Sequence, residues 1–137
     1  MPNILVVDDS SDTREPLMKL LRLYGHGVSA ASDGVEALHA IEEHTPDLIL
    51  LDVMMPHMDG LTFLQHLRHG QSPKKVPVII VSAVTDERVV KKCTELGIHC
   101  YLTKARFTFP QLLARVAEAL GPTSGGGGAA PTMQWPA

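Results

Sequence analysis

Acidic, hydroxyl and basic side chains stand at the ends of four short apolar runs in this chain. Asp8 and Asp9 follow the first of these runs, Asp52 the next, Ser82 the third and Lys104 the last. If the runs are parallel strands, their carboxyl ends meet at one edge of the sheet, and the five side chains share one crevice. Three carboxylates gathered there repel one another, which favours a hard divalent cation with oxygen ligands, Mg²⁺ or Mn²⁺.

Such a crevice suits phosphoryl transfer. The cation and Lys104 would neutralise phosphoryl oxygens, Ser82 would donate to one of them, and a carboxylate of the cluster can act as nucleophile and form an aspartyl phosphate. Taken singly, each residue has an ordinary explanation, since an Asp–Asp pair often caps a turn or helix and a lone lysine is usually a solvated charge. Their joint placement at four strand ends favours a site.

Apolar runs alternate with segments of helical periodicity along the chain. Strands that are apolar on both faces and separated by helices indicate a parallel sheet covered on both sides. Right-handed crossovers then give an α/β fold, a doubly wound (βα)₅ sandwich. The predicted strands are Asn3–Val7, Gly27–Ala31, Leu48–Leu51, Val76–Val81 and Ile98–Leu102.

Five helices are predicted between and after these strands. Pro16 suits the first turn of the first helix best, because it has no N–H to donate. The first helix has its apolar residues between Leu17 and Tyr24 and ends at Gly25. The second has Val35, Leu38 and Ile41 on one face and ends before Pro46, and the third has Leu61, Leu64 and Leu67 on one face and ends near Gly70. The fourth and fifth helices are predicted over Asp86–Leu96 and Phe109–Leu120.

Composition limits the class of protein. The 137 residues, 45% hydrophobic and 20% charged, fit one globular domain. A net charge of −3 argues against direct nucleic-acid binding, and no apolar run approaches the ~20 residues of a membrane span, so we expect no membrane insertion. Cys93 and Cys100 lack CxxC or zinc spacing, which fits the reducing cytosol, so a cytoplasmic location is expected.

The carboxyl-terminal segment has a different composition. Residues 121–137 hold five of the 11 glycines and three of the 10 prolines, and they carry no charge. The sequence therefore predicts a folded domain over residues 1–120 and a Gly/Pro/Ala-rich tail or linker over 121–137. Trp135, the single tryptophan, is either a linker residue or a docking anchor.

Four segments resemble the receiver domain of two-component response regulators, the family of the chemotaxis regulators. They are ILVVDDS at 4–10, PDLILLDVMMPHMDG at 46–60, VPVIIVSA at 76–83 and YLTK at 101–104, and the resemblance covers roughly residues 3–120. It implies a flavodoxin-like strand order 2-1-3-4-5, which is carried over from the family. It also implies a signalling protein, not an enzyme with its own substrate, that promotes its own phosphorylation and dephosphorylation.

The resemblance implies roles for the acidic residues. Asp52 would accept phosphate from a phosphohistidine on a histidine kinase or phosphotransfer protein. Asp9, Asp52 and the backbone carbonyl of Met54 would ligate Mg²⁺ or Mn²⁺, and Asp8 would act largely through water.

It also implies roles for the residues that read the phosphate. Lys104 would pair with the phosphoryl group, Ser82 would move toward it, and Tyr101 would swing inward as the switch aromatic. The fourth helix, fifth strand and fifth helix would carry the signal to an unidentified target protein, and the chain would be a monomer or weak dimer.

Two features depart from the family pattern. Ala105 stands where the family usually has a proline after the lysine, so we expect a trans Lys104–Ala105 bond and a slightly moved lysine, because a cis bond would cost about 2.5–4 kcal/mol. Met54 and Val84 lie two residues beyond Asp52 and Ser82, where the family tunes the phosphoryl lifetime. Both are apolar and unable to orient water, which predicts slow self-dephosphorylation.

Two alternatives stay open. The first is a phosphorylation-independent scaffold, against which the intact Asp9, Asp52, Ser82 and Lys104 argue. The second is a Mg²⁺-dependent aspartyl-phosphate hydrolase, but residues 8–12 do not match the Asp-x-Asp-x-Thr pattern of haloacid-dehalogenase-like phosphatases. The sequence also leaves open whether the receiver stands alone or is a fragment of a longer regulator.

Overall fold

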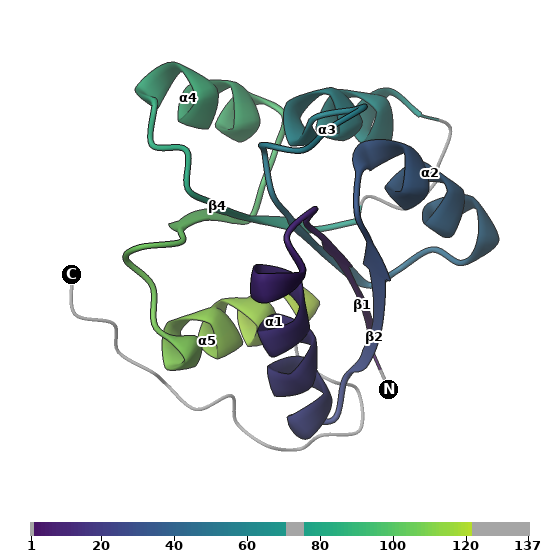
Figure 1. Cartoon of the computed structure of the whole chain (residues 1–137), viewed down its shortest axis with the longest axis vertical. Coiled ribbons are helices and arrows are strands. Elements are labelled where there is room, and N and C mark those ends of the chain that lie inside the picture. Colours follow the sequence, from purple (N-terminus) through teal and green to yellow (C-terminus); the bar gives the residue numbers. More distant parts are fainter. Residues whose placement is uncertain (1, 71–75, 122–137) are drawn as a thin grey trace.

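Five parallel strands form one sheet in the computed structural model, which describes residues 2–70 and 76–121 (Figure 1). Their order, β2-β1-β3-β4-β5, confirms the expected flavodoxin-like topology. β1, β2 and β3 have the predicted bounds. The strands are β1 (Asn3–Val7), β2 (Gly27–Ala31), β3 (Leu48–Leu51), β4 (Val78–Ser82) and β5 (Cys100–Thr103).

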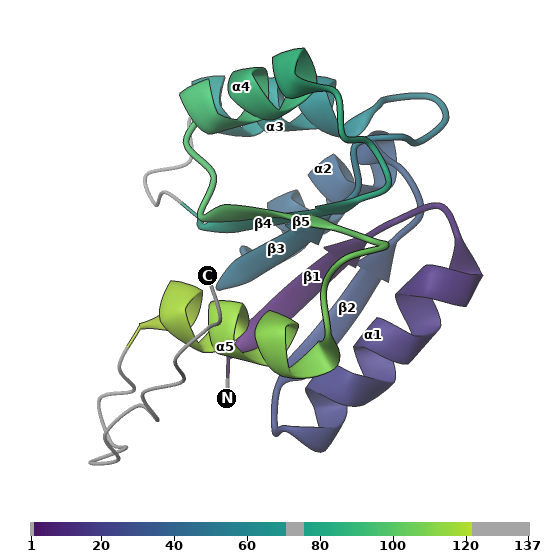
Figure 2. The same ribbon diagram turned by 90° about the vertical axis from the view of Figure 1, so that its left-hand side faces the viewer.

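Five helices cover the two faces of the sheet. α1 and α5 lie on one face, whereas α2, α3 and α4 lie on the other, which confirms the doubly wound α/β sandwich (Figures 1 and 2). The helices are α1 (Ser11–Leu23), α2 (Gly34–Glu43), α3 (Gly60–His69), α4 (Glu87–Glu95) and α5 (Phe109–Leu120).

Alternation along each strand divides the core into two clusters. Ile4 and Val6 of β1 lie in one cluster with Leu21 of α1. Leu5 and Val7 of the same strand lie in the other cluster, with side chains of α2, α3 and α4. Each of these side chains is at most 1% exposed, and full burial of one contributes about 1.5–3 kcal/mol. The sheet is thus held from both sides, which fixes the positions at which its strands end.

The bounds of β4 and β5 differ slightly from the prediction. β4 begins at Val78 because Pro77 has no N–H to donate to the ladder. It includes Ser82, which pairs with Thr103 of β5. Ser82 is therefore the last residue of its strand and not the first residue after it, while Lys104 follows β5 directly.

Pro16 lies in the interior of α1 and not in its first turn, so that expectation is wrong. α1 begins at Ser11, and a proline this far along removes the hydrogen bond that an N–H would donate to the carbonyl of Asp12. The helix continues through it because Leu17 and Leu21, both buried, hold the following turns against the sheet.

Val35 does not lie on the buried face of α2, contrary to the prediction that grouped it with Leu38 and Ile41. Its side chain is 41% exposed, whereas Ala37 is fully buried. Residues two positions apart on a helix point about 200° apart, so the burial of Ala37 turns Val35 outward. Leu38 and Ile41 do pack against the core, as predicted.

The described residues also bear on the membrane and domain predictions. Within residues 2–70 and 76–121, no helix is long and apolar enough to span a bilayer. α5 ends at Leu120. The predicted tail beyond Gly121, including Trp135, lies outside the described residues, so the boundary at residue 120 stays a prediction.

Gly60 marks a close approach between the start of α3 and the end of β3. Its N–H donates to the carbonyl oxygen of Val53 at 2.8 Å. A Cβ at this position would collide with the carbonyl oxygen of Asp52 and the backbone of Val53. The loop that follows Asp52 can therefore take this tight path only with glycine at its end.

We expect Gly60→Ala to lower the free energy of unfolding by about 3 kcal/mol, because backbone must shift to admit the methyl group. Gly25→Ala is the matched control, since φ is +86° there but no atom lies within 4 Å of the added Cβ. Its strain alone costs about 1 kcal/mol. Urea unfolding measures both variants, and a loss no larger for Gly60→Ala than for Gly25→Ala would contradict the steric explanation.

Candidate functional site

Asp8 and Asp52 emerge side by side from the centre of the sheet. Their preceding residues, Val7 and Leu51, are register partners in β1 and β3. The N–H of Asp52 donates to the carbonyl of Val7 at 2.9 Å, which continues the ladder by one residue. Both carboxyl residues are nearly inaccessible, at 2% exposed for Asp8 and 5% for Asp52. The sheet therefore holds two acidic groups next to each other with little access to water.

Lys104 supplies the positive charge that these two carboxylates need. Its Nζ lies 2.9 Å from Oδ2 of Asp8 and 3.1 Å from Oδ2 of Asp52. Its backbone N–H donates to the carbonyl of Ser82 at 2.9 Å, so the end of β4 holds the lysine in place. Burial lowers the pKa of Lys104, but the contacts with Asp8 and Asp52 outweigh burial, and the net pKa is raised. Lys104 is thus protonated and positively charged near neutral pH.

The Lys104–Ala105 peptide bond is trans, as expected for a lysine that no proline follows. The lysine still reaches both carboxylates, at 2.9 and 3.1 Å. The absence of proline at this position therefore leaves the ion pairs intact.

Asp9 completes a cluster of three carboxylates. Oxygen atoms of Asp8, Asp9 and Asp52 all lie within 4.8 Å of one another, with Asp9 exposed and the other two buried. Burial raises the pKa of Asp8, although the N–H of Ser10 and the charge of Lys104 oppose that rise. An oxygen-only donor set that opens to solvent at Asp9 fits a hard divalent cation such as Mg²⁺ or Mn²⁺.

Ser82 and Tyr101 meet at the loop that follows β4. Oγ of Ser82, which is fully buried, accepts a hydrogen bond from the N–H of Val84 at 3.1 Å. The hydroxyl of Tyr101 donates to the carbonyl of Val84 at 2.6 Å. Burial raises the pKa of Tyr101, so its hydroxyl stays protonated as a donor. The predicted switch pair is thus joined through one residue of the loop.

Met54 and Val84 each lie two residues beyond a residue of the site, Asp52 and Ser82, and donate their backbone N–H groups to it. The N–H of Met54 donates to Oδ1 of Asp52 at 3.3 Å, and its side chain is 65% exposed. Val84 is half-buried and packs against the core cluster on the α2, α3 and α4 face. Neither side chain presents a polar atom suited to orienting water beside Asp52.

A contact that the sequence did not predict ties the loop after β3 to α2. Nδ1 of His57 lies 2.8 Å from Oδ2 of Asp33, whose other oxygen accepts from the N–H of Glu36 as the N-cap of α2. His57 has a φ of +65°, and it is the one non-glycine residue with positive φ among those described. The N–H of Gly34 also donates to the carbonyl of Met58 at 3.2 Å. Nothing in the local sequence pattern signals this pairing of distant loops.

A second missed contact holds the backbone at the acidic cluster. Nη1 of Arg14, on α1, donates to the carbonyl oxygen of Asp8 at 2.7 Å. The guanidinium therefore fixes the turn that points Asp8 and Asp9 into the crevice. The helical periodicity predicted α1 but gave no reason to single out Arg14.

The amino-acid sequence of this chain is similar to those of known proteins. A family model described as the response regulator receiver domain matches residues 4–117. The transcriptional regulatory protein PrrA of Mycobacterium tuberculosis is 40% identical over 119 residues, which cover 87% of this chain and 50% of PrrA. The chain thus spans about half the length of the curated relatives it matches.

Solved structures of similar proteins have the same fold as this chain. The receiver domain of the Francisella response regulator 1452 superposes with a TM-score of 0.79 at 32% identity, covering 88% of this chain and 97% of that one. A chain of the CheX–CheY–BeF₃–Mg²⁺ complex from Borrelia burgdorferi superposes with a TM-score of 0.78 at 32% identity, covering 88% of this chain and 90% of that one.

We expect Asp33→Asn to lower the free energy of unfolding near neutral pH but not in acid. The N–H of Glu36 and the imidazole of His57 lower the pKa of Asp33 in the folded state below 3.8. A lowered carboxyl pKa gives stability that is present above the unfolded pKa and is lost as the pH falls through the folded pKa. Urea unfolding of both proteins from pH 7 down to about pH 3 measures this difference.

The pKa of Asp33 is lowered by the N–H of Glu36 and by the imidazole of His57, and the variant His57→Asn separates these two causes in the same measurement. Asparagine tolerates the positive φ of this position but carries no imidazole. In that background the effect of Asp33→Asn should shrink without vanishing, since the N-cap bond remains. An effect of Asp33→Asn that is equal at every pH would contradict the electrostatic explanation.

Proposed function

Because the chain belongs to the response regulator receiver domain family, we propose that it accepts phosphate on Asp52 from a histidine kinase or phosphotransfer protein. The observation that carries this proposal is the buried Asp52 carboxylate held 3.1 Å from the ammonium of Lys104, within the cluster that includes Asp8 and Asp9. The protein is then a signalling switch that promotes its own phosphorylation and dephosphorylation.

In the proposed transfer, a carboxylate oxygen of Asp52 attacks the phosphorus of the donor's phosphohistidine. The new P–O bond forms as the P–N bond breaks, and the imidazole nitrogen keeps the electron pair and takes up a proton. Lys104 is close enough to Asp52 to exchange a carboxylate contact for a phosphoryl oxygen. Positioning and charge neutralisation dominate such reactions, and buried, already paired groups provide both.

The divalent cation of this proposal is Mg²⁺ or Mn²⁺. Asp9, Asp52 and the backbone carbonyl of Met54 would ligate it, and Asp8 would contact it through water. When bound, the cation neutralises carboxylate and phosphoryl charge. The close oxygens of Asp8, Asp9 and Asp52 support this assignment, and the similar Borrelia complex contains Mg²⁺ together with BeF₃.

The proposed switch runs from the phosphoryl group to the face made by α4, β5 and α5. Ser82 would donate to a phosphoryl oxygen, which would shift the loop at Val84. Because Tyr101 hydrogen-bonds the carbonyl of Val84, that shift would be passed to β5. A change of this face would then alter the binding of a target protein.

The partners we propose are proteins, namely the phosphodonor and a downstream target, with the chain as a monomer or weak dimer. The net charge of −3 supports the absence of direct nucleic-acid contact by this domain. The activity that the name of PrrA describes belongs to that whole protein, of which this chain matches half.

We expect acetyl phosphate with Mg²⁺ to add about 80 Da to the protein, one phosphoryl group. The adduct should be absent in Asp52→Asn, because the nucleophile is gone, and it should fall sharply when EDTA removes the cation. Asp59→Asn is the matched control, since Asp59 caps α3 in the same loop and lies outside the cluster. Intact-mass spectrometry measures all four samples.

An unmodified wild-type protein under these conditions would favour the phosphorylation-independent scaffold instead. An adduct that survives in Asp52→Asn would move the acceptor to another residue. Steady release of phosphate from phosphate esters would revive the hydrolase. A phosphotransfer profile against purified histidine kinases then identifies the donor, with Asp52→Asn as the negative control.

The apolar side chains of Met54 and Val84 predict a long-lived aspartyl phosphate. Met54→Asn and Val84→Gln should each shorten its half-life, by about tenfold together, because a polar side chain there can orient water for attack. Val35→Asn is the control, since Val35 is exposed on α2. The decay of the mass adduct after removal of acetyl phosphate gives the half-life. A short wild-type half-life that these changes leave unaltered would refute the prediction.

A further inference from the structure

The loop between β3 and α3 carries two of the groups proposed above as cation ligands. We call residues 52–59 the β3–α3 loop; it begins with Asp52, and the carbonyl of Met54 follows two residues later. A loop carbonyl takes its direction from the path of the backbone around it, and Mg²⁺ demands near-ideal octahedral geometry. Whatever fixes the path of this loop therefore bears on how well the cation is held.

The turn between β2 and α2 holds the second half of this loop. We call residues 31–34 the β2–α2 turn. Oδ2 of Asp33 lies 2.8 Å from Nδ1 of His57, three residues beyond Met54. At the next residue of each segment, the N–H of Gly34 donates to the carbonyl oxygen of Met58 at 3.2 Å. A Cβ on Gly34 would lie within 2.9 Å of three atoms of Met58, so the two segments are packed as closely as glycine allows.

The same turn is bonded to the first acidic segment. The N–H of Asp8 donates to the carbonyl oxygen of Ala31 at 3.1 Å, and Asp9, another proposed ligand, follows Asp8 directly. The β2–α2 turn thus contacts both segments that carry proposed ligands, in addition to the ladder between β1 and β3. A shift of the turn against either segment would change the spacing of the ligands.

His57 is an unusual residue for its backbone conformation. Its φ of +65° lies in the left-handed region that residues other than glycine rarely adopt. Its side chain is 73% exposed, so burial does not explain why a histidine stands there. Residues strained in this way persist where surrounding contacts hold them, and they gather at functional sites. The contact with Asp33 provides such a hold.

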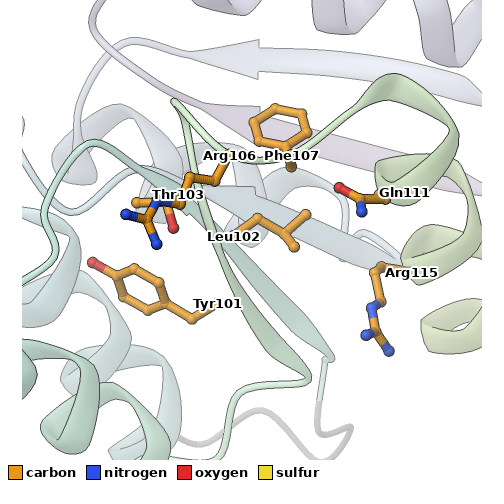
Figure 3. A pocket seen from close by; sticks show the side chains of 7 residues that line it. All are labelled: Tyr101, Leu102, Thr103, Arg106, Phe107, Gln111 and Arg115. Atoms are coloured by element: carbon orange, nitrogen blue, oxygen red, sulfur yellow. The ribbon is translucent and has the colours of Figure 1, made fainter. Parts of the chain in front are cut away.

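The lysine side of the crevice is built from other elements. Lys104 follows β5, and its N–H donates to the carbonyl of Ser82 in β4 at 2.9 Å. Figure 3 shows the neighbouring part of β5, where Leu102 and Phe107 line a hollow of about 220 Å³. β2 and β5 are opposite edges of the sheet. Loss of a contact at the β2–α2 turn should therefore leave Lys104 in place.

We propose that the contact between His57 and Asp33 positions the carbonyl of Met54 for the divalent cation. It does so by keeping the β3–α3 loop in one path relative to the carboxylates. This rests on the proposed function, which supplies the cation. His57 and Asp33 are positioning residues, and neither touches the cation. Without their contact the loop samples several paths, and the measured affinity falls with the fraction of the population that can bind.

Titration of the full chain with Mn²⁺ alone tests the proposal, with free Mn²⁺ followed by its electron paramagnetic resonance signal. His57→Gly removes the imidazole but permits positive φ, and Asp33→Ser keeps an N-cap for α2 but is too short to reach His57. Each should raise the dissociation constant for Mn²⁺ about fivefold. The double variant should bind no more weakly than either single variant, because both changes remove the same contact.

Asp59→Ser is the matched control. Asp59 caps α3 in the same loop, so this change removes the same negative charge as Asp33→Ser and leaves a capping residue in place. It should change the dissociation constant by less than about twofold, since surface charges contribute little. His57→Gly removes no negative charge, so a loss of affinity there has no simple electrostatic cause. A purely structural role would lower the free energy of unfolding and leave the dissociation constant of the folded protein unchanged.

Three results would overturn the proposal: unchanged Mn²⁺ affinity in His57→Gly and Asp33→Ser, additive losses in the double variant, or an equal loss in Asp59→Ser. The phosphoryl adduct separates this proposal from the phosphorylation of Asp52. At saturating Mg²⁺ the variants should form the adduct to the wild-type extent, because Lys104 is held by other elements.

Equal Mn²⁺ binding by all variants with a normal adduct refutes the positioning role alone. The expected losses of affinity without any adduct in the wild type refute phosphorylation of Asp52 and leave the positioning role supported. A wild-type protein that binds no Mn²⁺ refutes the cation assignment and the positioning role together.

Discussion

The ammonium of Lys104, shared between the buried carboxylates of Asp8 and Asp52, is the interaction on which the rest of this structure depends. Two adjacent carboxylates with 2% and 5% exposure repel each other and lose most of their hydration, so they need a cation nearby. The parallel register of β1 and β3 brings the two acids together, and the pairing of β4 with β5 brings the lysine to them. The tight turn at Gly60 then closes the loop beside Asp52. The apolar core that holds the strands in this order and register therefore also holds the three charges together.

Much of the fold could be predicted because the strands carry their own signal. A run such as Leu48–Leu51, apolar on both faces, has few places to lie other than the centre of a covered sheet. The structure differs from the sequence-based expectation where tertiary packing overrides local preference. The buried Leu17 and Leu21 keep α1 intact through Pro16, and the position of Ala37 against the sheet decides which way Val35 points.

The cluster of Asp8, Asp9, Asp52 and Lys104 was also predictable in outline, because parallel strands bring their carboxyl ends to one edge. The Asp33–His57 contact was not, since it joins two loops whose paths depend on helix packing, and periodicity carries no information about loops.

The strand order has a mechanical consequence. The acids follow β1 and β3, and each of these strands is clamped by a neighbour on both sides, whereas Lys104 follows β5, which is held by one ladder. The carboxylates thus lie at the end of the central strands, and their counter-ion lies at the end of an edge strand. We therefore expect a change in charge at the crevice to move β5 more than β1 or β3. Because Tyr101 packs in one core cluster and Leu102 in the other, movement of this single strand reaches both helical layers at once.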